Sequence, residues 1–564
     1  MQELIKPNRR STRGHGVSHR GPGELRGNLR RRHVAMPWGL ANGGELSYDS
    51  DMTDDNTESD PQRPRKRWRK TRWFYGIVLS YFAITIAAGV WWSAYSHEKF
   101  NEAVDSIIAS GQPLAWSDFA IEPVPDDQNA AILYTRAIEV PIVQDNSKVI
   151  RLVFAEFMEQ RELEAHNVIH EFFKDREVRR KHAKELRKLM GMARQAFALC
   201  REARSLDKIN WGIDFTRNAY ELDLFGIQDH IRVAVLLSLA AVEAHDAGRD
   251  DDAVEYLRDI LALGRALDTA PTAVHHLMSI AIHAHIDPAL EQILPSIQVG
   301  DSPGRVKREN LRAFMSELLD TTQCSRGLTR ALMGERSTGY DISQSILILK
   351  ILDEQSSGVP GVKTYSVVSS SNPLLRSSFD FGVAPLFRLD AAWAIKHNDA
   401  YVRTSKLGTL PECRRSLRAP LKELDERVEN LSFSQPLTTL LVPRLERMFE
   451  LHHAAIARRR LSAAAIAVRM YKIDHGSRPE SLEDLVPKYL LKVPQDPMDE
   501  PGKSIRYIND PETPRLYSVG QNGLDEQGVF DDLGEVDTKE ILMFLIQRPR
   551  TDKKDSESDS DGGD

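Results

Sequence analysis

The chain has little cysteine and lacks most of the short motifs by which common enzyme classes are identified. Its 564 residues include three cysteines, Cys200, Cys324 and Cys413, which lie far apart and form no C-x-x-C pair. Such a sparse, odd set excludes a disulfide framework and a thiolate zinc site. The sequence also contains no H-E-x-x-H, G-x-x-x-x-G-K-[ST] or G-x-G-x-x-G, and G-x-S-x-G occurs once, at residues 300–304. So short a serine pattern indicates a hydrolase only where a strand precedes it and a helix follows directly. Nucleotide binding and H-E-x-x-H zinc proteases therefore have no support in the sequence.

The chain also lacks an excess of basic residues and has few stretches of strand-like alternation. Lys and Arg number 75 against 82 Asp and Glu, which gives a formal net charge of −7. Nucleic-acid binding by the bulk of the protein is therefore not expected. Apolar residues between 98 and 470 recur mostly at helical spacing. This pattern predicts a mainly α-helical fold.

One long apolar run, residues 73–95, stands out because it contains no charged residue. As a helix, its 23 residues span roughly 35 Å, which is enough to cross a membrane with some tilt. Aromatic side chains stand near both of its ends, as they do at membrane interfaces: Trp68, Trp73, Trp91, Trp92 and Tyr95. We therefore predict a transmembrane signal-anchor helix over 73–95.

A buried core helix and a cleaved signal peptide are the alternative interpretations of this run. A buried helix of such length usually has a polar face, and here the polar side chains are only Ser80, Tyr81, Thr85 and Ser93. A signal peptide has an apolar core of about 7–15 residues and small residues at its cleavage site. This run ends in the bulky WWSAYSHEKF, and 72 residues precede it. An uncleaved anchor accounts for these features best.

The charges on either side of the run predict its orientation. Seven of the eleven residues 62–72 are Lys or Arg, whereas residues 96–118 contain one Lys and four acidic residues. Because basic residues stay on the cytoplasmic side, the N-terminus is expected in the cytoplasm. The prediction is a single-pass protein of the cell membrane with an extracytoplasmic C-terminal domain.

Changes in composition divide the chain into five parts. The ends have low hydrophobicity and blocks of charge, which is typical of disorder. The predicted parts are a disordered cytoplasmic tail (1–72), the transmembrane helix (73–95), an extracytoplasmic helical domain (96–470), a small α+β module (471–547) and a disordered acidic tail (548–564).

The clearest helical unit lies within residues 233–267. It shows a helix, a break at 246–249 and a second helix with Ala253, Leu257 and Ile260 directed inward. This helix–turn–helix pattern is similar to one tetratricopeptide-type hairpin, but no second copy follows at a fixed period. We therefore expect an irregular, tetratricopeptide-like helical array.

Three segments follow one another between residues 471 and 532: YKIDHGSRPESLEDLVPKYL, VPQDPMDEPGKSIRY and LYSVGQNGLDEQG. This block resembles the C-terminal part of the major pseudopilin of type II secretion systems. In that family a long helix ends, a P-x-D-P-x turn leads to a small sheet, and an S-x-G-x-x-G segment forms a calcium-binding loop. The apolar run departs from that family, because it holds no Glu and lies far before the block. The resemblance thus implies a shared C-terminal module.

The remainder of the chain is similar to a class of membrane-anchored proteins found in planctomycete bacteria. The residues that carry this resemblance are PVPDDQNAAILYTRAI, the GER of 334–336 and the same C-terminal block. This resemblance implies no particular activity.

The pseudopilin resemblance implies a calcium site in which Asp525 and Asp532 are the ligands. Calcium prefers six to eight oxygen ligands, and acidic residues among turn carbonyls supply them. The spacing of an EF-hand is absent. The alternative is a solvated acidic turn, because Asp and Gly are the ordinary residues of turns.

A group of histidines offers a second candidate metal site. His276 and His283 are seven residues apart and share a helix face, so both imidazoles can face one zinc ion. Zinc catalysis needs a third ligand, and Asp287 is the only local candidate. The alternative is that these histidines, together with His275 and His285, are structural or surface residues.

No catalytic residue is predicted, and calcium is the only possible cofactor. The favoured interpretation is a membrane-anchored, non-catalytic interaction or scaffold protein of the cell envelope, with a protein partner of unknown identity. The alternatives are a metal-dependent envelope hydrolase at the histidines and a calcium-stabilised docking element for secretion machinery.

Overall fold

The computed structural model describes residues 65–145, 176–217, 226–344, 384–430, 442–529 and 540–546, with isolated positions between 147 and 159. Most of the predicted N-terminal tail and all of the acidic tail at 548–564 lie outside the described residues. Contacts divide the chain into two units, Met1–Tyr75 and Gly76–Asp564. The contacts discussed below lie within the second unit.

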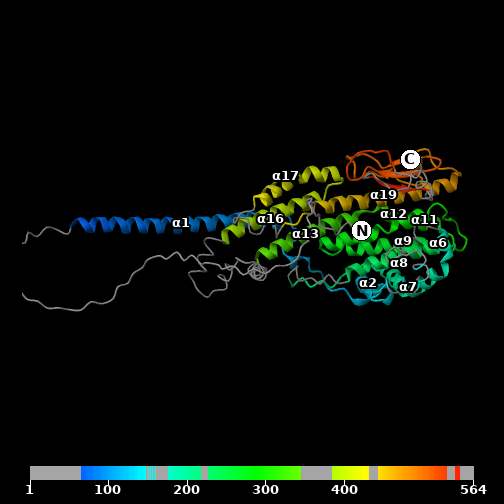
Figure 1. The fold of residues 1–564 in the computed structure, drawn as a ribbon, viewed down its shortest axis with the longest axis horizontal. Coiled ribbons are helices and arrows are strands. Elements are labelled where there is room, and N and C mark those ends of the chain that lie inside the picture. The colour runs from blue at the N-terminus through cyan, green and yellow to red at the C-terminus, as the bar shows by residue number, and fades with distance from the viewer. Residues whose placement is uncertain are drawn as a thin grey trace, which may run out of the picture. The chain divides into compact units, whose positions relative to one another are not determined.

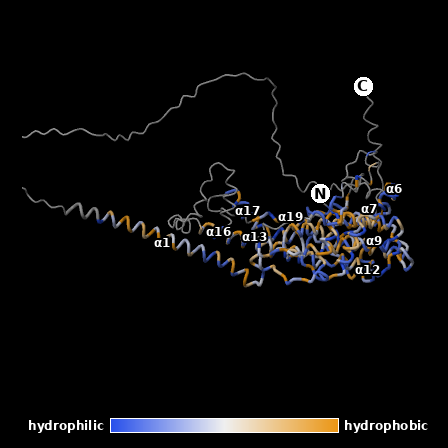
Figure 2. Tube along the Cα trace, turned by 90° about the horizontal axis from the view of Figure 1, so that it is seen from below, coloured by the Kyte–Doolittle hydropathy of each residue, from blue (hydrophilic) through white to orange (hydrophobic). Residues whose placement is uncertain are grey.

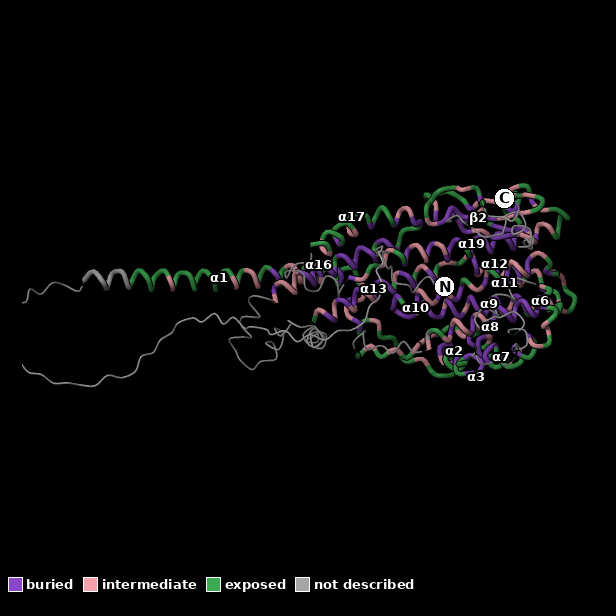
Figure 3. Tube along the Cα trace, in the orientation of Figure 1, coloured by how far each residue is buried: buried purple, intermediate pink, exposed green. Residues whose placement is uncertain are grey.

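The first helix, α1 (Arg65–Ala109), contains the whole of the predicted span 73–95. Among the described residues it is the one helix that is long and apolar enough to cross a membrane. Its apolar side chains are exposed to solvent: Trp73 is 74% exposed and Leu79 is 68% exposed. Figure 2 shows hydrophobic residues along this helix, and Figure 3 shows that most of it is uncovered. The helix is therefore a candidate membrane span.

The helix α1 does not end with the apolar run but continues without interruption from residue 96 to Ala109. Gly111, with φ of +68°, follows its last turn. Ala103 and Ile107 are buried against Ala392 and Ile395 of α16 (Ala384–Thr404). The expected start of the domain at residue 96 thus falls inside a helix whose last turns belong to the domain.

Helices make up most of the described domain (Figure 1). Besides α1 and α16 they are α2 (Ala130–Ile138), α3 (Pro141–Gln144), α6 (Arg176–Lys181), α7 (Ala183–Arg204), α8 (Ile227–Asp246), α9 (Asp250–Leu267), α10 (Ala273–His283), α11 (Ile286–Ile293), α12 (Arg308–Leu319), α13 (Thr322–Gln344), α17 (Leu410–Glu429) and α19 (Glu446–His475), with 3-10 turns at Trp116–Phe119, Asp126–Gln128 and Leu482–Leu485. The mainly helical fold is confirmed.

The hairpin predicted within 233–267 is formed by α8 and α9, which pack against each other. Gly248 has φ of +75°, a left-handed conformation that glycine adopts at little cost, and it lies in the turn. The residues predicted to point inward, Ala253, Leu257 and Ile260, are fully buried. The arrangement of the other helices as tetratricopeptide-like repeats stays a prediction.

The GER sequence of α13 makes three different structural contacts. A Cβ on Gly334 would overlap the carbonyl oxygen of Pro271, so only glycine permits this close approach. The Glu335 carboxylate accepts a hydrogen bond from the Ala273 amide (3.1 Å) in the first turn of α10. The buried Arg336 guanidinium donates to Asp399 (2.6 Å) and to two acceptors in residues 112–113. Packing and hydrogen bonding account for all three residues.

A small antiparallel sheet, with strand order β1-β2-β3, forms the C-terminal module. Its strands are β1 (Arg506–Ile508), β2 (Arg515–Ser518) and β3 (Ile541–Phe544), and β2 and β3 contact α19. The alternation of the sequence predicts short strands at 505–509 and 515–519, which β1 and β2 confirm. Residues 540–546, for which the pattern allows a strand or a helix end, contain β3. Leu516 and Met543 belong to the same hydrophobic core as the helical domain. The boundary predicted at residue 470 falls inside α19.

Candidate functional site

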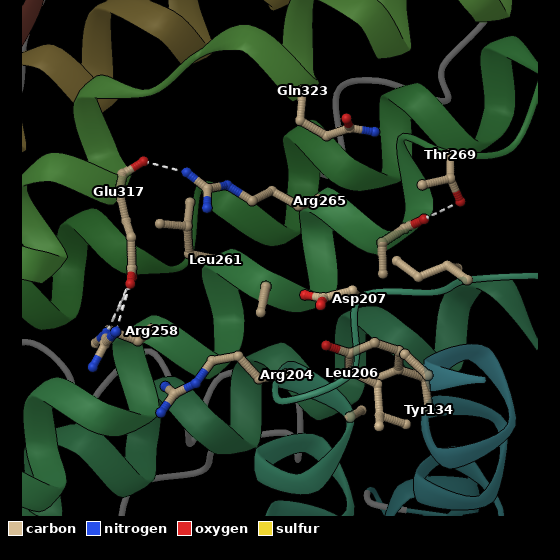
Figure 4. Close-up of a pocket in the computed structure, with 15 residues that line it drawn as sticks. Tyr134, Arg204, Leu206, Asp207, Arg258, Leu261, Arg265, Thr269, Glu317 and Gln323 are labelled. Carbon is tan, nitrogen blue, oxygen red and sulfur yellow. Dashed lines mark hydrogen bonds and ion pairs between the residues drawn. The ribbon is translucent and has the colours of Figure 1, made fainter. Parts of the chain in front are cut away.

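A cleft of about 560 Å³ lies between helices of the domain (Figure 4). One side is a stripe of α9, because residues three or four apart share a helix face: Arg258, Leu261, Ala262, Arg265 and Ala266. The remaining lining comes from α2, the end of α7, the segment after α7, α12 and the start of α13. The cleft therefore joins residues that are nearly 200 positions apart, from Ala130 to Gln323.

Two of the three arginines in the cleft are neutralised by carboxylates. Arg258 donates from Nε to both carboxylate oxygens of Glu317 (3.2 and 3.1 Å) and from a terminal nitrogen to Glu255 (2.7 Å). Arg204 pairs with Glu255 and with Asp259, which lies 2.9 Å away. Burial raises the pKa of Asp259 to about 6 although arginines beside it act to lower it. These residues form a continuous ionic network along one wall.

Arg265 differs from them because backbone carbonyl oxygens hold its guanidinium. It donates to the carbonyl of Glu317 and to that of Asp320 (3.3 Å) at the end of α12. The nearest carboxylate oxygen, that of Asp320, is 4.0 Å away on a side chain that is 58% exposed. The Arg265 Nε is buried and has no hydrogen-bond partner among the described residues.

Three further polar side chains line the cleft and form no hydrogen bonds among the described residues: Tyr134, Asp207 and Gln323. Tyr134 is 1% exposed, and burial raises the pKa of its hydroxyl well above the usual value. Figure 4 shows Tyr134, Asp207 and Gln323 on different sides of the cavity. Polar groups that converge on a cleft are the groups that fix the orientation of a ligand in a binding site.

The two histidines of the predicted zinc site are buried and already hydrogen-bonded within the protein. His276 bonds through Nδ1 to Asp268 (2.8 Å) and through Nε2 to His452 (3.2 Å). His283 Nε2 lies 3.1 Å from the carbonyl of Leu261. Burial lowers the pKa of His283 to about 3, so this imidazole is neutral at pH 7.

The described residues contain no group of three or more His, Cys, Asp or Glu side chains that could hold a metal ion. Asp287, the local candidate for a third ligand, accepts a hydrogen bond from Ser462 (2.8 Å) and lies 3.6 Å from Arg458. Zinc binding at His276 and His283 therefore stays a prediction, without a third ligand in this part of the chain.

The buried chain Asp268–His276–His452 was not expected from the sequence. His452 lies on α19, 176 residues after His276, and its Nδ1 is also 3.7 Å from the Sγ of Cys324. Burial, followed by the nearby His453 and His276, lowers the pKa of His452 well below its usual value. Local sequence spacing cannot identify such a chain, since its members meet only in the folded core.

Asp525 of the predicted calcium loop and two acidic residues at the VPQDP turn surround an arginine in the described structure. The Arg506 guanidinium contacts Asp496 (3.0 Å), Asp499 (2.6 Å) and Asp525 (2.9 Å). Asp525 also accepts hydrogen bonds from the Tyr517 hydroxyl and a backbone amide. Asp532 lies outside the described residues. A calcium site with Asp525 and Asp532 as ligands therefore stays a prediction, and Arg506 supplies positive charge beside Asp525.

The VPQDP turn is held together by Asp496, which is 1% exposed. Its carboxylate accepts hydrogen bonds from the Met498 amide (2.9 Å), the Ser518 hydroxyl (2.7 Å) and the Val519 amide (3.1 Å). These three bonds connect this turn to itself or to the end of β2, and Arg506 of β1 donates to the same carboxylate (3.0 Å). The aspartate of the motif therefore fixes the turn against the sheet.

Comparisons with known proteins give no match: no family model fits the chain, and no curated protein or solved structure matches it.

Proposed function

We propose that this chain is a single-pass membrane-anchored, non-catalytic interaction protein whose helical domain binds a partner in the α9 cleft. Its N-terminus lies in the cytoplasm and its domain lies on the other side of the membrane. The exposed apolar surface of α1 and the basic cluster before its apolar run support this placement.

The observation that carries the binding function is the set of unsatisfied polar groups in the cleft. Buried polar groups are normally hydrogen-bonded, yet the Arg265 Nε and the Tyr134 hydroxyl form no hydrogen bond among the described residues. A ligand that forms hydrogen bonds with such groups gains free energy on binding.

The state of the cysteines supports a non-catalytic role. Burial raises the pKa of the Cys413 thiol to about 12 and raises the pKa of Cys200 and Cys324 still further. All three are therefore thiols at neutral pH, and the thiolate is the form that acts as a nucleophile.

Site-specific photocrosslinking tests the binding function. A photoreactive residue is introduced at Gln323 in the cleft or, as a control, at the exposed Asp301, which does not line it. In membranes of the producing cell we expect a discrete adduct from position 323 that is absent from position 301. No adduct, or the same adducts from both positions, would contradict partner binding in the cleft.

Protease treatment of intact cells tests the orientation. An extracytoplasmic domain is digested from outside, whereas a cytoplasmic domain survives until the membrane is permeabilised. Elemental analysis of the purified chain tests the two alternatives, since stoichiometric zinc would support the hydrolase and stoichiometric calcium the docking element.

A further inference from the structure

We infer that the α9 cleft recognises a short peptide element that carries both a carboxylate and an ammonium or guanidinium group. This inference rests on the binding function proposed above and adds the chemistry of the bound group.

The recognition of a carboxylate follows from the position of Arg265. Arg258 and Arg204 face carboxylates at hydrogen-bond distance, so their charges are already balanced. The Arg265 guanidinium donates from one terminal nitrogen to carbonyl oxygens, its other terminal nitrogen forms no hydrogen bond among the described residues, and its side chain is 24% exposed. A ligand carboxylate at this point forms a charge-assisted hydrogen bond and neutralises the guanidinium.

The recognition of a cation follows from Asp207 in the segment between α7 and α8. Its carboxylate lines the cleft and has no ion pair among the described residues. In Figure 4 this side chain points into the cavity. Asp207 is exposed, so water solvates its carboxylate, and a ligand ammonium or guanidinium group replaces this water with an ion pair.

The neutral groups of the cleft favour a peptide over other molecules with two charges. The Tyr134 hydroxyl and the Gln323 amide each can donate and accept hydrogen bonds, which suits the alternating N–H and C=O groups of a peptide backbone. Leu206, Ile209 and Leu261 provide apolar surface for a side chain. The volume of about 560 Å³ lies within the range of roughly 300–1,000 Å³ that is usual for ligand sites.

Titration with one tripeptide in four forms tests the inference. The full-length chain in detergent micelles is titrated calorimetrically with Ala-Leu-Ala that has free ends, an acetylated N-terminus, an amidated C-terminus or both ends blocked. We expect the free-ended form to bind about tenfold more tightly than either singly blocked form, because each blocked end removes one charge-assisted contact. Equal affinities for the four forms, or no binding of any form, would overturn the inference.

Variants connect each charge of the peptide to one residue. Asp207→Asn should remove the preference for a free N-terminus, and Arg265→Gln the preference for a free C-terminus. Asp301→Asn, at an exposed position outside the cleft, should keep both preferences. Arg265 also donates to carbonyl groups at the end of α12. The peptide affinities of its variant are therefore compared with those of the wild type only if the two melting temperatures agree. Tyr134→Phe removes only a hydroxyl and should lower the affinity for the free-ended peptide several-fold. It is the second decisive variant.

The two proposals fail in different ways. If none of the tripeptides binds but position 323 still yields its discrete adduct, the peptide chemistry is wrong and partner binding in the cleft stands. If the peptides bind equally to the wild type and to Asp207→Asn and Tyr134→Phe, they bind elsewhere and the inference is overturned.

Discussion

Gly334 of α13 lies directly against the carbonyl oxygen of Pro271, with no space for a side chain between them. This contact brings α13 to the N-terminal end of α10, where Glu335 accepts a hydrogen bond from the Ala273 amide. Two consecutive residues thus set the distance between these helices and satisfy a free amide at the start of one of them.

Gly334→Ala tests this contact. The added methyl group would overlap a backbone oxygen, which cannot rotate away, so we expect the free energy of unfolding to fall by about 1–3 kcal/mol. Denaturant unfolding measures the change. Gly191→Ala is the matched control, since this glycine also lies in a helix, α7, but has open space around its Cα. The control should be neutral or stabilising by up to about 1 kcal/mol, and equal effects of the two variants would refute the contact.

Arg506→Gln tests whether the arginine balances the acidic cluster of the C-terminal module. The variant leaves Asp496, Asp499 and Asp525 without their shared cation, so we expect a loss of about 3 kcal/mol in unfolding free energy. Millimolar calcium should restore part of this loss, because it binds the carboxylates that the arginine has left.

The wild type gives the complementary result. With Arg506 in place, EDTA should leave the melting temperature unchanged, and Lys503→Gln, at an exposed position, should behave like the wild type. A lower melting temperature of the wild type in EDTA would instead support the calcium site predicted from Asp525 and Asp532.

His283→Gln tests the effect of a buried neutral imidazole on acid stability. The pKa of His283 is about 3 in the folded chain against about 6.5 for an unfolded histidine. Between these values the unfolded chain binds the extra proton, so stability falls as pH decreases, by up to about 1.4 kcal/mol per pH unit from this one group. In His283→Gln the imidazole is absent, so this part of the pH dependence of the unfolding free energy disappears.

The expected result is a pair of curves of unfolding free energy against pH that converge as the pH falls from 6.5 towards 4. The variant is less stable at pH 7, because it loses the packing of the ring against Gly264. His475→Gln, at an exposed position, is the control and should run parallel to the wild type. Parallel curves for His283→Gln would show that this histidine does not contribute to acid unfolding.

Tyr134→Phe tests whether the Tyr134 hydroxyl forms no hydrogen bond within the folded chain. If no hydrogen bond is lost, the unfolding free energy should stay unchanged or rise by up to about 1 kcal/mol. Tyr489→Phe is the contrasting variant, since that hydroxyl donates to Asp474 at 2.6 Å, and it should cost about 1–2 kcal/mol. A similar loss in both variants would mean that Tyr134 is already hydrogen-bonded.

The sequence predicted the elements that depend on local pattern. The apolar run, the α8–α9 hairpin and the strands at 505–509 and 515–519 are encoded by neighbouring residues, so periodicity and composition identified them. The same information did not show where α1 ends, because residues 96–109 are amphipathic and gain their partners only from α16.

The candidate site was not predictable in this way. The cleft combines Tyr134, Asp207, Arg265 and Gln323, which come from four separate segments. In the sequence each is an ordinary polar residue of a helix or a connecting segment. The histidines attracted attention because they are close in sequence, yet His276 pairs with His452, on a distant helix. A site made by tertiary packing becomes visible only when the packing is known.

The uninterrupted course of α1 determines how the domain is presented if the helix spans a membrane. A flexible linker of n residues would have a root-mean-square end-to-end distance of about 5–6 Å × √n. Here no such linker follows the apolar run, because Phe100, five positions after Tyr95, stacks on Tyr340 of α13. The cleft would then be held at a fixed distance from the lipid surface and in a fixed orientation relative to it. If the cleft binds a partner as proposed, membrane partners reach it by lateral diffusion within a thin layer, and a partner whose matching element stands at another height cannot contact it.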